Sequence, residues 1–203
     1  MLFRSTRGPL AIPGTYTVHV ALAGDTVTGT VVVRKDPHSA GSDQDVRAQA
    51  TLALELRGDL NRTVDMINRI EWVKKQLADV RAVLQDSSTD TGNVPVKDLL
   101  DAAKGVEDSA VAVERALYDV NLTGAREDSF RAPMRLYGRL AALLSDVAEN
   151  SADFPPTTQQ QEVHDVLHAR LDDAARAFQS WVDGTLAAFR ARIRAVNLPD
   201  VVP

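Results

Sequence analysis

Two different spacings of apolar residues divide the chain near residue 37. Residues 15–22 alternate between apolar and polar side chains, with the apolar positions at Tyr16, Val18, Val20 and Leu22. This period of two is typical of a strand with one buried face. The turn residues Ala23-Gly24-Asp25 follow, and then the β-branched segment 26–34, so the pattern predicts a β-hairpin that ends at Asp36-Pro37.

Beyond residue 38 the apolar residues recur at intervals of three and four, which is the spacing of amphipathic helices. The pattern predicts four helices, over residues 43–85, from Pro95 to residues 121–124, from residue 132 to before Phe154, and from Thr157 or Thr158 to residues 197–199. Ser42 or Asp43 is expected to cap the first helix. Since short polar loops join the helices, we expect an antiparallel four-helix bundle whose first and last helices extend past the other two.

These patterns predict a mainly α chain with a β-hairpin in residues 1–37 and a four-helix bundle in residues 38–203. A two-stranded hairpin is only marginally stable in water unless its apolar face packs on something else. The rest of the sequence reads as helical and supplies no further strands. We therefore expect the hairpin to be the end of a truncated β-sandwich whose other strands lie outside this sequence.

Composition and charge exclude several classes of function. The chain has 203 residues, of which 44% are apolar and 25% charged, and it contains no cysteine. The values are those of an ordinary globular protein, and the lack of cysteine excludes disulfides, cysteine-ligated metals and thiol nucleophiles. A formal net charge of −5 argues against nucleic acid as a partner. No apolar run is long enough to span a membrane, and residues 1–7 do not lead into the apolar segment of a signal peptide.

One set of residues has the spacing of metal ligands. His164, His168 and Asp172 lie four residues apart, so a helix places them on one face, and two imidazoles with a carboxylate can bind zinc or iron. A zincin-type site needs a glutamate directly after the first histidine, where this chain has Asp165. A stand-alone metal-dependent enzyme is therefore kept as an alternative, and no residue is assigned as catalytic, cofactor-binding or metal-ligating.

Other residue patterns have structural explanations. The chain has no Gly-x-Ser-x-Gly motif and no phosphate-binding glycine loop. The acidic pairs Glu107-Asp108 and Asp172-Asp173 are neighbours on helices and point in different directions, as solvated surface charges do. The large aromatic residues of the helical part fall on or beside the apolar stripes and are expected in the core: Trp72, Phe178, Trp181 and Phe189.

Several segments resemble the end of a bacterial protein family. Residues 8–18 read Gly-Pro-Leu-Ala-Ile-Pro-Gly-Thr-Tyr-Thr-Val, and residues 31–37 read Val-Val-Val-Arg-Lys-Asp-Pro. They resemble the last strands of a small β-sandwich in the sortilin-like β-propeller proteins with BNR or Asp-box repeats, which are commonly labelled glycosyl hydrolases. In that family a long-helix tail follows the sandwich, and residues 133–140 and 151–159 resemble its third helix and the following turn.

The resemblance implies a function without a site in this chain. No Asp-box of the Ser-x-Asp-x-Gly-x-Thr-Trp kind occurs, so the propeller and its site residues lie outside the sequence. We expect a non-catalytic C-terminal module for assembly, spacing or partner binding, encoded as part of a longer gene. Its partner would be the missing propeller or sandwich, or another protein, and the parent family is expected to be exported to the periplasm or beyond. A free-standing bundle that forms a homodimer is a further alternative.

Overall fold

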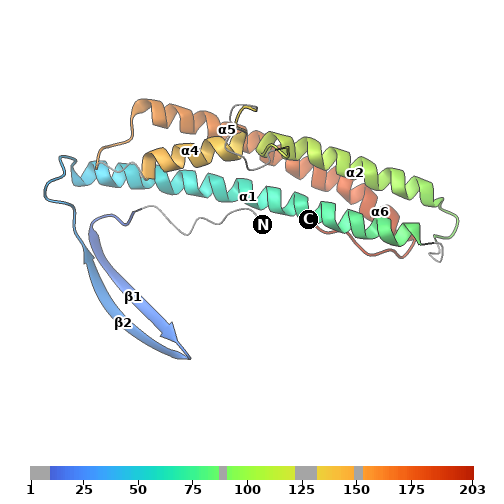
Figure 1. Ribbon diagram of the computed structural model, residues 1–203, viewed down its shortest axis with the longest axis horizontal. Helices are drawn as coiled ribbons and strands as arrows, with labels where there is room; N and C mark the ends of the chain where they lie inside the picture. Colours follow the sequence, from blue (N-terminus) through green and yellow to red (C-terminus); the bar gives the residue numbers. More distant parts are fainter. Residues whose placement is uncertain (1–9, 87–90, 122–131, 149–152) are drawn as a thin grey trace. The chain divides into compact units, whose positions relative to one another are not determined.

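The computed structural model describes residues 10–86, 91–121, 132–148 and 153–203 (Figure 1). About two thirds of these residues are helical, and an antiparallel two-stranded hairpin precedes the helices. The helical segments are α1 (Asp43–Gln85), α2 (Val96–Leu117), α4 (Leu136–Ala148), α5 (Thr158–Trp181), the π-helical turn η1 (Val182–Leu186) and α6 (Ala187–Ala195). The prediction of a mainly α fold, a helical bundle preceded by a hairpin, is confirmed.

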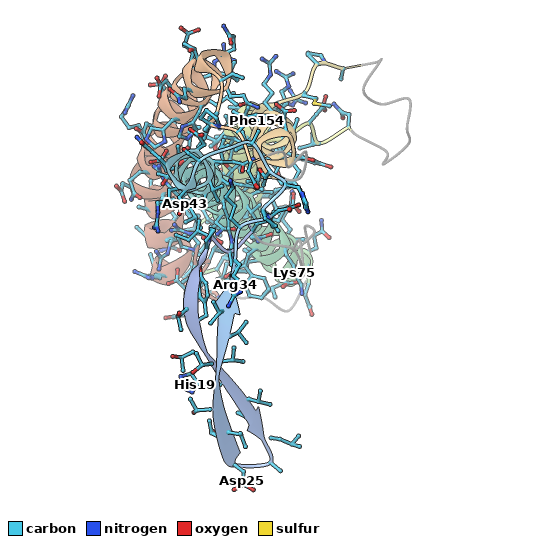
Figure 2. The ribbon with its side chains drawn as sticks, turned by 90° about the vertical axis from the view of Figure 1, so that its left-hand side faces the viewer. His19, Asp25, Arg34, Asp43, Lys75 and Phe154 are labelled. Atoms are coloured by element: carbon cyan, nitrogen blue, oxygen red, sulfur yellow. The ribbon has the colours of Figure 1, made fainter. Side chains whose placement is uncertain are left out.

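The hairpin consists of β1 (Gly14–Leu22) and β2 (Asp25–Val33). Ala23 and Gly24 form the two-residue turn with φ angles of 51° and 96°, as in a type I′ turn. Tyr16 pairs with Val31 and Val20 with Val27, so the predicted apolar residues of both strands share one face. The opposite face is rich in threonine: Thr15, Thr17, His19, Thr26, Thr28 and Thr30. Figure 2 shows side chains standing along the hairpin from Arg34 to Asp25 at its tip.

Most of the apolar hairpin face is exposed to solvent. The exposed fraction rises from 40% for Val18 to 60% for Val20 and 78% for Leu22 near the tip. On β2, Val27 and Val31 are also exposed, whereas Tyr16 and Val33 at the other end of the face are half-buried. The described part of the chain therefore does not supply the cover that this face needs.

The chain divides into two compact units. The first contains the described parts of residues 59–139 together with 166–203, and the second contains residues 10–58, which include the hairpin, and the described parts of residues 140–165. The helices α1 and α5 each contribute residues to both units.

In the first unit the buried residues of α1 follow spacings of three and four, with Ile70, Val73, Leu77, Val80 and Leu84 inside. This register places Trp72 beside the core line, and its side chain is 51% exposed. The prediction that Trp72 packs in the core is therefore wrong. The other three predicted core aromatics are buried: Phe178, Trp181 and Phe189.

The π-helical turn η1 keeps the last part of the chain in register with the core. Buried residues of α5 follow the same spacing up to Phe178 and Trp181, but the next buried residue is Leu186, five positions on. The wider π turn accommodates the extra residue, so that Phe189 and Ile193 of α6 stay on the buried side. The predicted fourth helix thus contains a π turn that the apolar pattern did not reveal.

In the second unit, α1 contributes Leu52, Ala53 and Leu56, and α4 contributes Leu140, Leu143 and Val147. The predicted caps are present: Asp45 N–H donates to Ser42 Oγ, and Gln160 N–H donates to Thr157 Oγ1. The third predicted helix starts at Leu136 instead of residue 132. On α5 the buried line passes through His164 and Leu167, whereas Val163 and Val166 are exposed.

Candidate functional site

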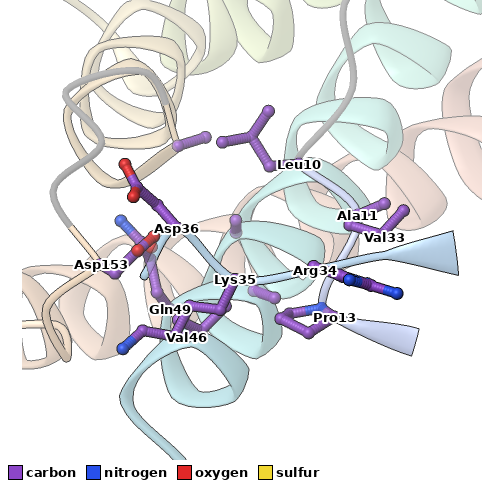
Figure 3. Close-up of a pocket in the computed structure, with 13 residues that line it drawn as sticks. Leu10, Ala11, Pro13, Val33, Arg34, Lys35, Asp36, Val46, Gln49 and Asp153 are labelled. Carbon is purple, nitrogen blue, oxygen red and sulfur yellow. The ribbon is translucent and has the colours of Figure 1, made fainter. Parts of the chain in front are cut away.

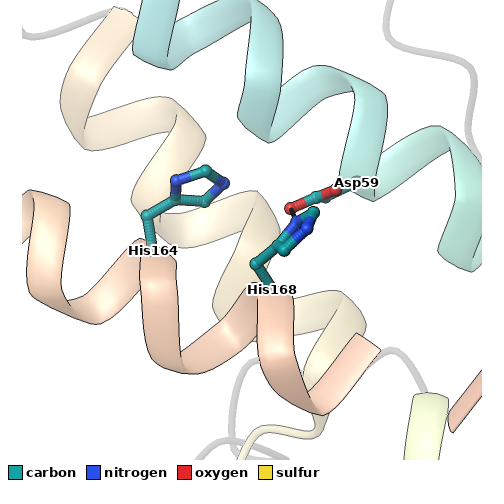
Figure 4. Close-up of side chains that lie close together, drawn as sticks. All are labelled: Asp59, His164 and His168. Carbon is teal, nitrogen blue, oxygen red and sulfur yellow. Dashed lines mark hydrogen bonds and ion pairs between the residues drawn. The ribbon is translucent and has the colours of Figure 1, made fainter. Parts of the chain in front are cut away.

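The structure pairs His168 with a residue that the sequence pattern did not single out. His168 Nδ1 lies 2.8 Å from Oδ2 of Asp59 on α1, and its Nε2 lies 3.9 Å from Oδ2 of Asp172. Figure 4 shows His164 and His168 one turn apart on α5, with Asp59 facing His168. The structure therefore brings His168 and Asp172 together, as the spacing predicts, and adds Asp59.

Arg62 sets the chemistry of this cluster. Its guanidinium lies 2.9 Å from Oδ1 of Asp172 and 3.8 Å from Oδ1 of Asp59. The hydrogen bond with Asp59 raises the pKa of His168, and the hydrogen bond from Arg62 lowers the pKa of Asp172. The guanidinium carries a fixed positive charge and therefore repels a metal ion. The geometry is that of an ion-pair network between α1 and α5.

His164 lies one turn before His168 on α5, and the two side chains bring a ring nitrogen of each to within 4.8 Å of the other. The His164 side chain is buried on the core line of α5, with Nδ1 4.0 Å from Oε2 of Glu55 in the same unit. The sequence gives no signal for Asp59, because Leu56 and Leu60 mark an apolar stripe that passes beside it. The actual line passes through Asp59 and Thr63, two polar residues that are both buried. Thr63 Oγ1 donates to the Asp59 carbonyl one turn earlier on α1, whereas the Asp59 carboxylate has its partner, His168, on α5.

A second buried charge lies on α2. Glu114 is 1% exposed, and its Oε2 accepts a hydrogen bond from Lys74 Nζ at 3.0 Å. Lys74 Nζ also donates to Glu71 Oε1 at 2.6 Å. Burial raises the pKa of Glu114 to about 7. Its neighbour Val113 is the apolar residue at this point of α2, so the sequence pattern gives no signal for Glu114.

The C-terminal segment is fastened to the first unit by side-chain bonds. Asp200 accepts hydrogen bonds from Arg190 and Arg194, and these two cations hold the pKa of its carboxyl far below the usual range. Gln76 bonds both the N–H and the carbonyl of Val202, and Val201 between these anchors is fully buried. The basic end of α6 thus binds this segment.

Two pockets lie where the hairpin joins the helices, both within the second unit. One has a volume of about 330 Å³ and is lined by Leu10, Val33, Val46, Lys35 and Gln49 among others (Figure 3). Lys35 Nζ donates to the Ser39 carbonyl and Gln49 Nε2 to the Val147 carbonyl, so both groups serve the fold. The second pocket, of about 450 Å³, is lined mainly by apolar side chains with Arg47 and Arg57. The described residues of neither pocket present a nucleophile with a base.

Within the described residues, none of the helices combines the length and the apolar character required to cross a membrane. No known protein family, curated protein or solved structure matches the chain. The feature that most needs a functional explanation is the exposed apolar face of the hairpin, defined by Val18, Val20, Leu22, Val27 and Val31.

Proposed function

We propose that the chain is a non-catalytic accessory module that uses its hairpin to attach to β-structure in a larger protein. The observation that carries this proposal is the apolar hairpin face, which the described helices leave in solvent. The module would serve assembly, spacing or partner binding. The resemblance of residues 8–18 and 31–37 to the sortilin-like propeller proteins suggests that the parent protein belongs to that glycosyl-hydrolase-labelled family.

The energetics favour a covered hairpin. Burying a valine or leucine side chain contributes about 1.5 to 3 kcal/mol, and five such side chains are exposed on this face. An exposed apolar surface of this kind is typical of an interaction site. An isolated hairpin gains little stability from the pairing of its own two strands. A partner that covers the face would stabilise both the hairpin and the attachment.

A β-sheet is the partner that suits this hairpin best. Apart from Asp25 and His19, residues 14–33 carry no ionisable side chain except the phenol of Tyr16. Each strand of the two-stranded sheet has one edge without a strand partner in the described residues. A partner sheet can satisfy the backbone groups of an edge and cover the apolar face, as in a β-sandwich.

The coding DNA upstream of Met1 tests the family assignment. An open reading frame that encodes Asp-box repeats would support the propeller parent, whereas an in-frame stop codon directly before Met1 would contradict it. This observation is independent of the purified protein's behaviour.

Two variants test the hairpin as the point of attachment. Val20→Lys/Val27→Glu places an opposite-charge pair on the apolar face, and Thr17→Lys/Thr30→Glu places the same pair on the threonine face. Binding to the separately expressed upstream β-region should be lost with the first variant and kept with the second. Equal binding by both variants would refute attachment through the apolar face.

The alternative function is a metal-dependent enzyme, and the metal content of the purified chain distinguishes it from the accessory module. About one zinc or iron per chain, lost in His164→Ala/His168→Ala, would favour the enzyme. The pairing of Arg62 with Asp172 and Asp59 leads us to expect no stoichiometric metal. Sizing chromatography tests the other alternative, a homodimeric bundle. If the dimer persists in Val20→Lys/Val27→Glu, its interface lies on the helices.

A further inference from the structure

Helix α2 carries an acidic residue where its packing calls for an apolar one. Glu114 lies on the same buried line as Leu99, Ala103, Val106, Ala110 and Leu117. Replacing a buried ion pair by apolar residues is often neutral or stabilising. The packing of α2 therefore does not by itself require a carboxyl group at this position.

The partners of Glu114 form an unbalanced set of charges. Lys74 Nζ lies 3.0 Å from Glu114 Oε2 and 2.6 Å from Glu71 Oε1, so one ammonium faces two carboxyl groups. Glu71 is largely exposed, whereas Glu114 is fully buried. With both carboxylates ionised the cluster has a net charge of −1, and with one proton bound it is neutral.

Other charged groups near α2 are engaged elsewhere. The segments η1 and α6 also pack against α2, and their charged residues are Asp183, Arg190, Arg192 and Arg194. Asp183 accepts from Gln179, Arg192 donates to the Asp98 carbonyl, and the other two arginines bind Asp200. The charged groups that act on Glu114 within the described residues are thus Glu71 and Lys74 of α1.

We propose that Glu71, Lys74 and Glu114 form a proton-sensitive clamp, which holds α2 on α1 while one proton is bound and loosens α2 when that proton is lost. The proton resides on Glu114, because burial disfavours its charged form more than that of the exposed Glu71. After loss of the proton, the buried Glu114 carboxylate has to share the single Lys74 ammonium with Glu71, and the cluster carries a net charge of −1. Water can relieve this charge when α2 opens.

The direction of the pH dependence follows from the shifted pKa. Burial raises the pKa of Glu114 from 4.5 to about 7 in the folded chain. The folded state then binds more protons than the open state between these values, so the clamp is strongest below pH 4.5 and weakens as pH rises through 7. The opening constant of α2 should rise by up to about tenfold per pH unit in this range and level off above it.

Residue-resolved hydrogen exchange of the full chain between pH 5.5 and 8.5 tests the clamp. After correction for intrinsic rates, wild-type α2 amides should lose protection as pH rises to about 7, while Glu114→Gln, which imitates the protonated form, should stay protected throughout. Glu107→Gln is the matched control, because Glu107 lies on the same helix and pairs with Arg81, and it should keep the wild-type profile. Resolution by residue separates α2 from the His168 pair, which joins α1 and α5.

A pH profile of α2 that is the same in wild type and Glu114→Gln would overturn the proposal. If Glu114→Gln does not fold, the carboxyl carbon resonance of Glu114 in the wild-type chain decides instead. A midpoint near 7 supports the clamp, and a midpoint at the ordinary value of 4.5 overturns it.

Discussion

Two glycines make opposite contributions to the stability of the second unit. Gly58 lies inside α1, and a Cβ added there would meet no heavy atom within 4 Å. Gly41 precedes the cap of α1, and a Cβ there would overlap the carbonyl oxygen of Asp153. Small size is therefore needed at Gly41 and not at Gly58.

Gly58→Ala should raise the free energy of unfolding by about 1 kcal/mol, because alanine loses less backbone entropy than glycine in a helix. Gly41→Ala should lower it by more than that, since the contact with Asp153 is to the backbone and cannot be relieved by a rotamer change. Urea unfolding of both variants measures the difference. A lower stability for Gly58→Ala would contradict this prediction and would mean that α1 needs a flexible point at residue 58.

The pair Asp59–His168 should make stability depend on pH. Its hydrogen bond raises the pKa of His168 above 6.5, so its contribution is fully present below pH 6.5 and is lost as pH rises through the folded value. Proton NMR should find the His168 midpoint above 6.5 in the wild type and lower in Asp59→Asn. Thermal melting should separate these two proteins most near pH 6 and less near pH 8.

Asp165→Asn is the control for that experiment, because Asp165 is an exposed acid on the same helix. It should leave the His168 midpoint where it is in the wild type. An equal change in both variants would mean that general charge on α5, and not the bond to Asp59, determines the titration.

Partners such as Asp59 and Glu114 lie beyond what the sequence pattern can predict. Spacings of three and four identify which face of a helix is buried, to within about one residue. They do not give the register between two helices, which decides that His168 meets Asp59 and that Lys74 meets Glu114. The candidate pair His168 and Asp172 was predictable because both lie on one helix.

At the scale of the elements, the sequence predicted the bounds of helices and strands where capping residues, turn residues and apolar spacing formed an uninterrupted pattern. The bounds of α1 match the prediction because Ser42 caps its start and polar turn residues follow Gln85. The strands β1 and β2 match because alternation continues up to a Gly-containing turn. The π turn η1 had no such signal, since Gly184 and Thr185 also occur in ordinary helix surfaces.

The π turn leads to a prediction about chain length. Deleting the exposed Gly184 should convert η1 into regular α-helix and leave Trp181, Leu186 and Phe189 on the buried face, because the turn holds one surplus residue. The variant should melt at a temperature equal to or above that of the wild type. Circular dichroism during heating provides the measurement.

Deleting the exposed Arg170 is the matched comparison within α5. That deletion rotates every following residue by about 100°, which moves Leu171 and Phe178 off the buried line. It should lower the melting temperature sharply or prevent folding. If the Gly184 deletion were equally damaging, the π turn would have a role other than absorbing a residue.

At the scale of the whole molecule, the helices and the hairpin differ in how much of their apolar surface is buried. The helices bury their apolar lines against one another within each unit, whereas the hairpin exposes Val20, Leu22 and Val27. The sequence predicted this imbalance, because two strands cannot form a sandwich and the remaining pattern is helical. Spacing alone does not identify a partner for the exposed apolar face.

The exposed hairpin should make the isolated chain associate with itself. Unpaired strand edges and an uncovered apolar face favour pairing between copies, and the helical part offers no comparable exposed strand among the described residues. Light scattering should therefore show a molecular mass that increases with concentration for the wild type and for Thr17→Lys/Thr30→Glu. The apolar-face variant Val20→Lys/Val27→Glu should stay monodisperse, with an unchanged helical melting curve. If the wild-type chain remains monodisperse at high concentration, this face does not drive association. That result would contradict the proposal that the hairpin is the attachment surface.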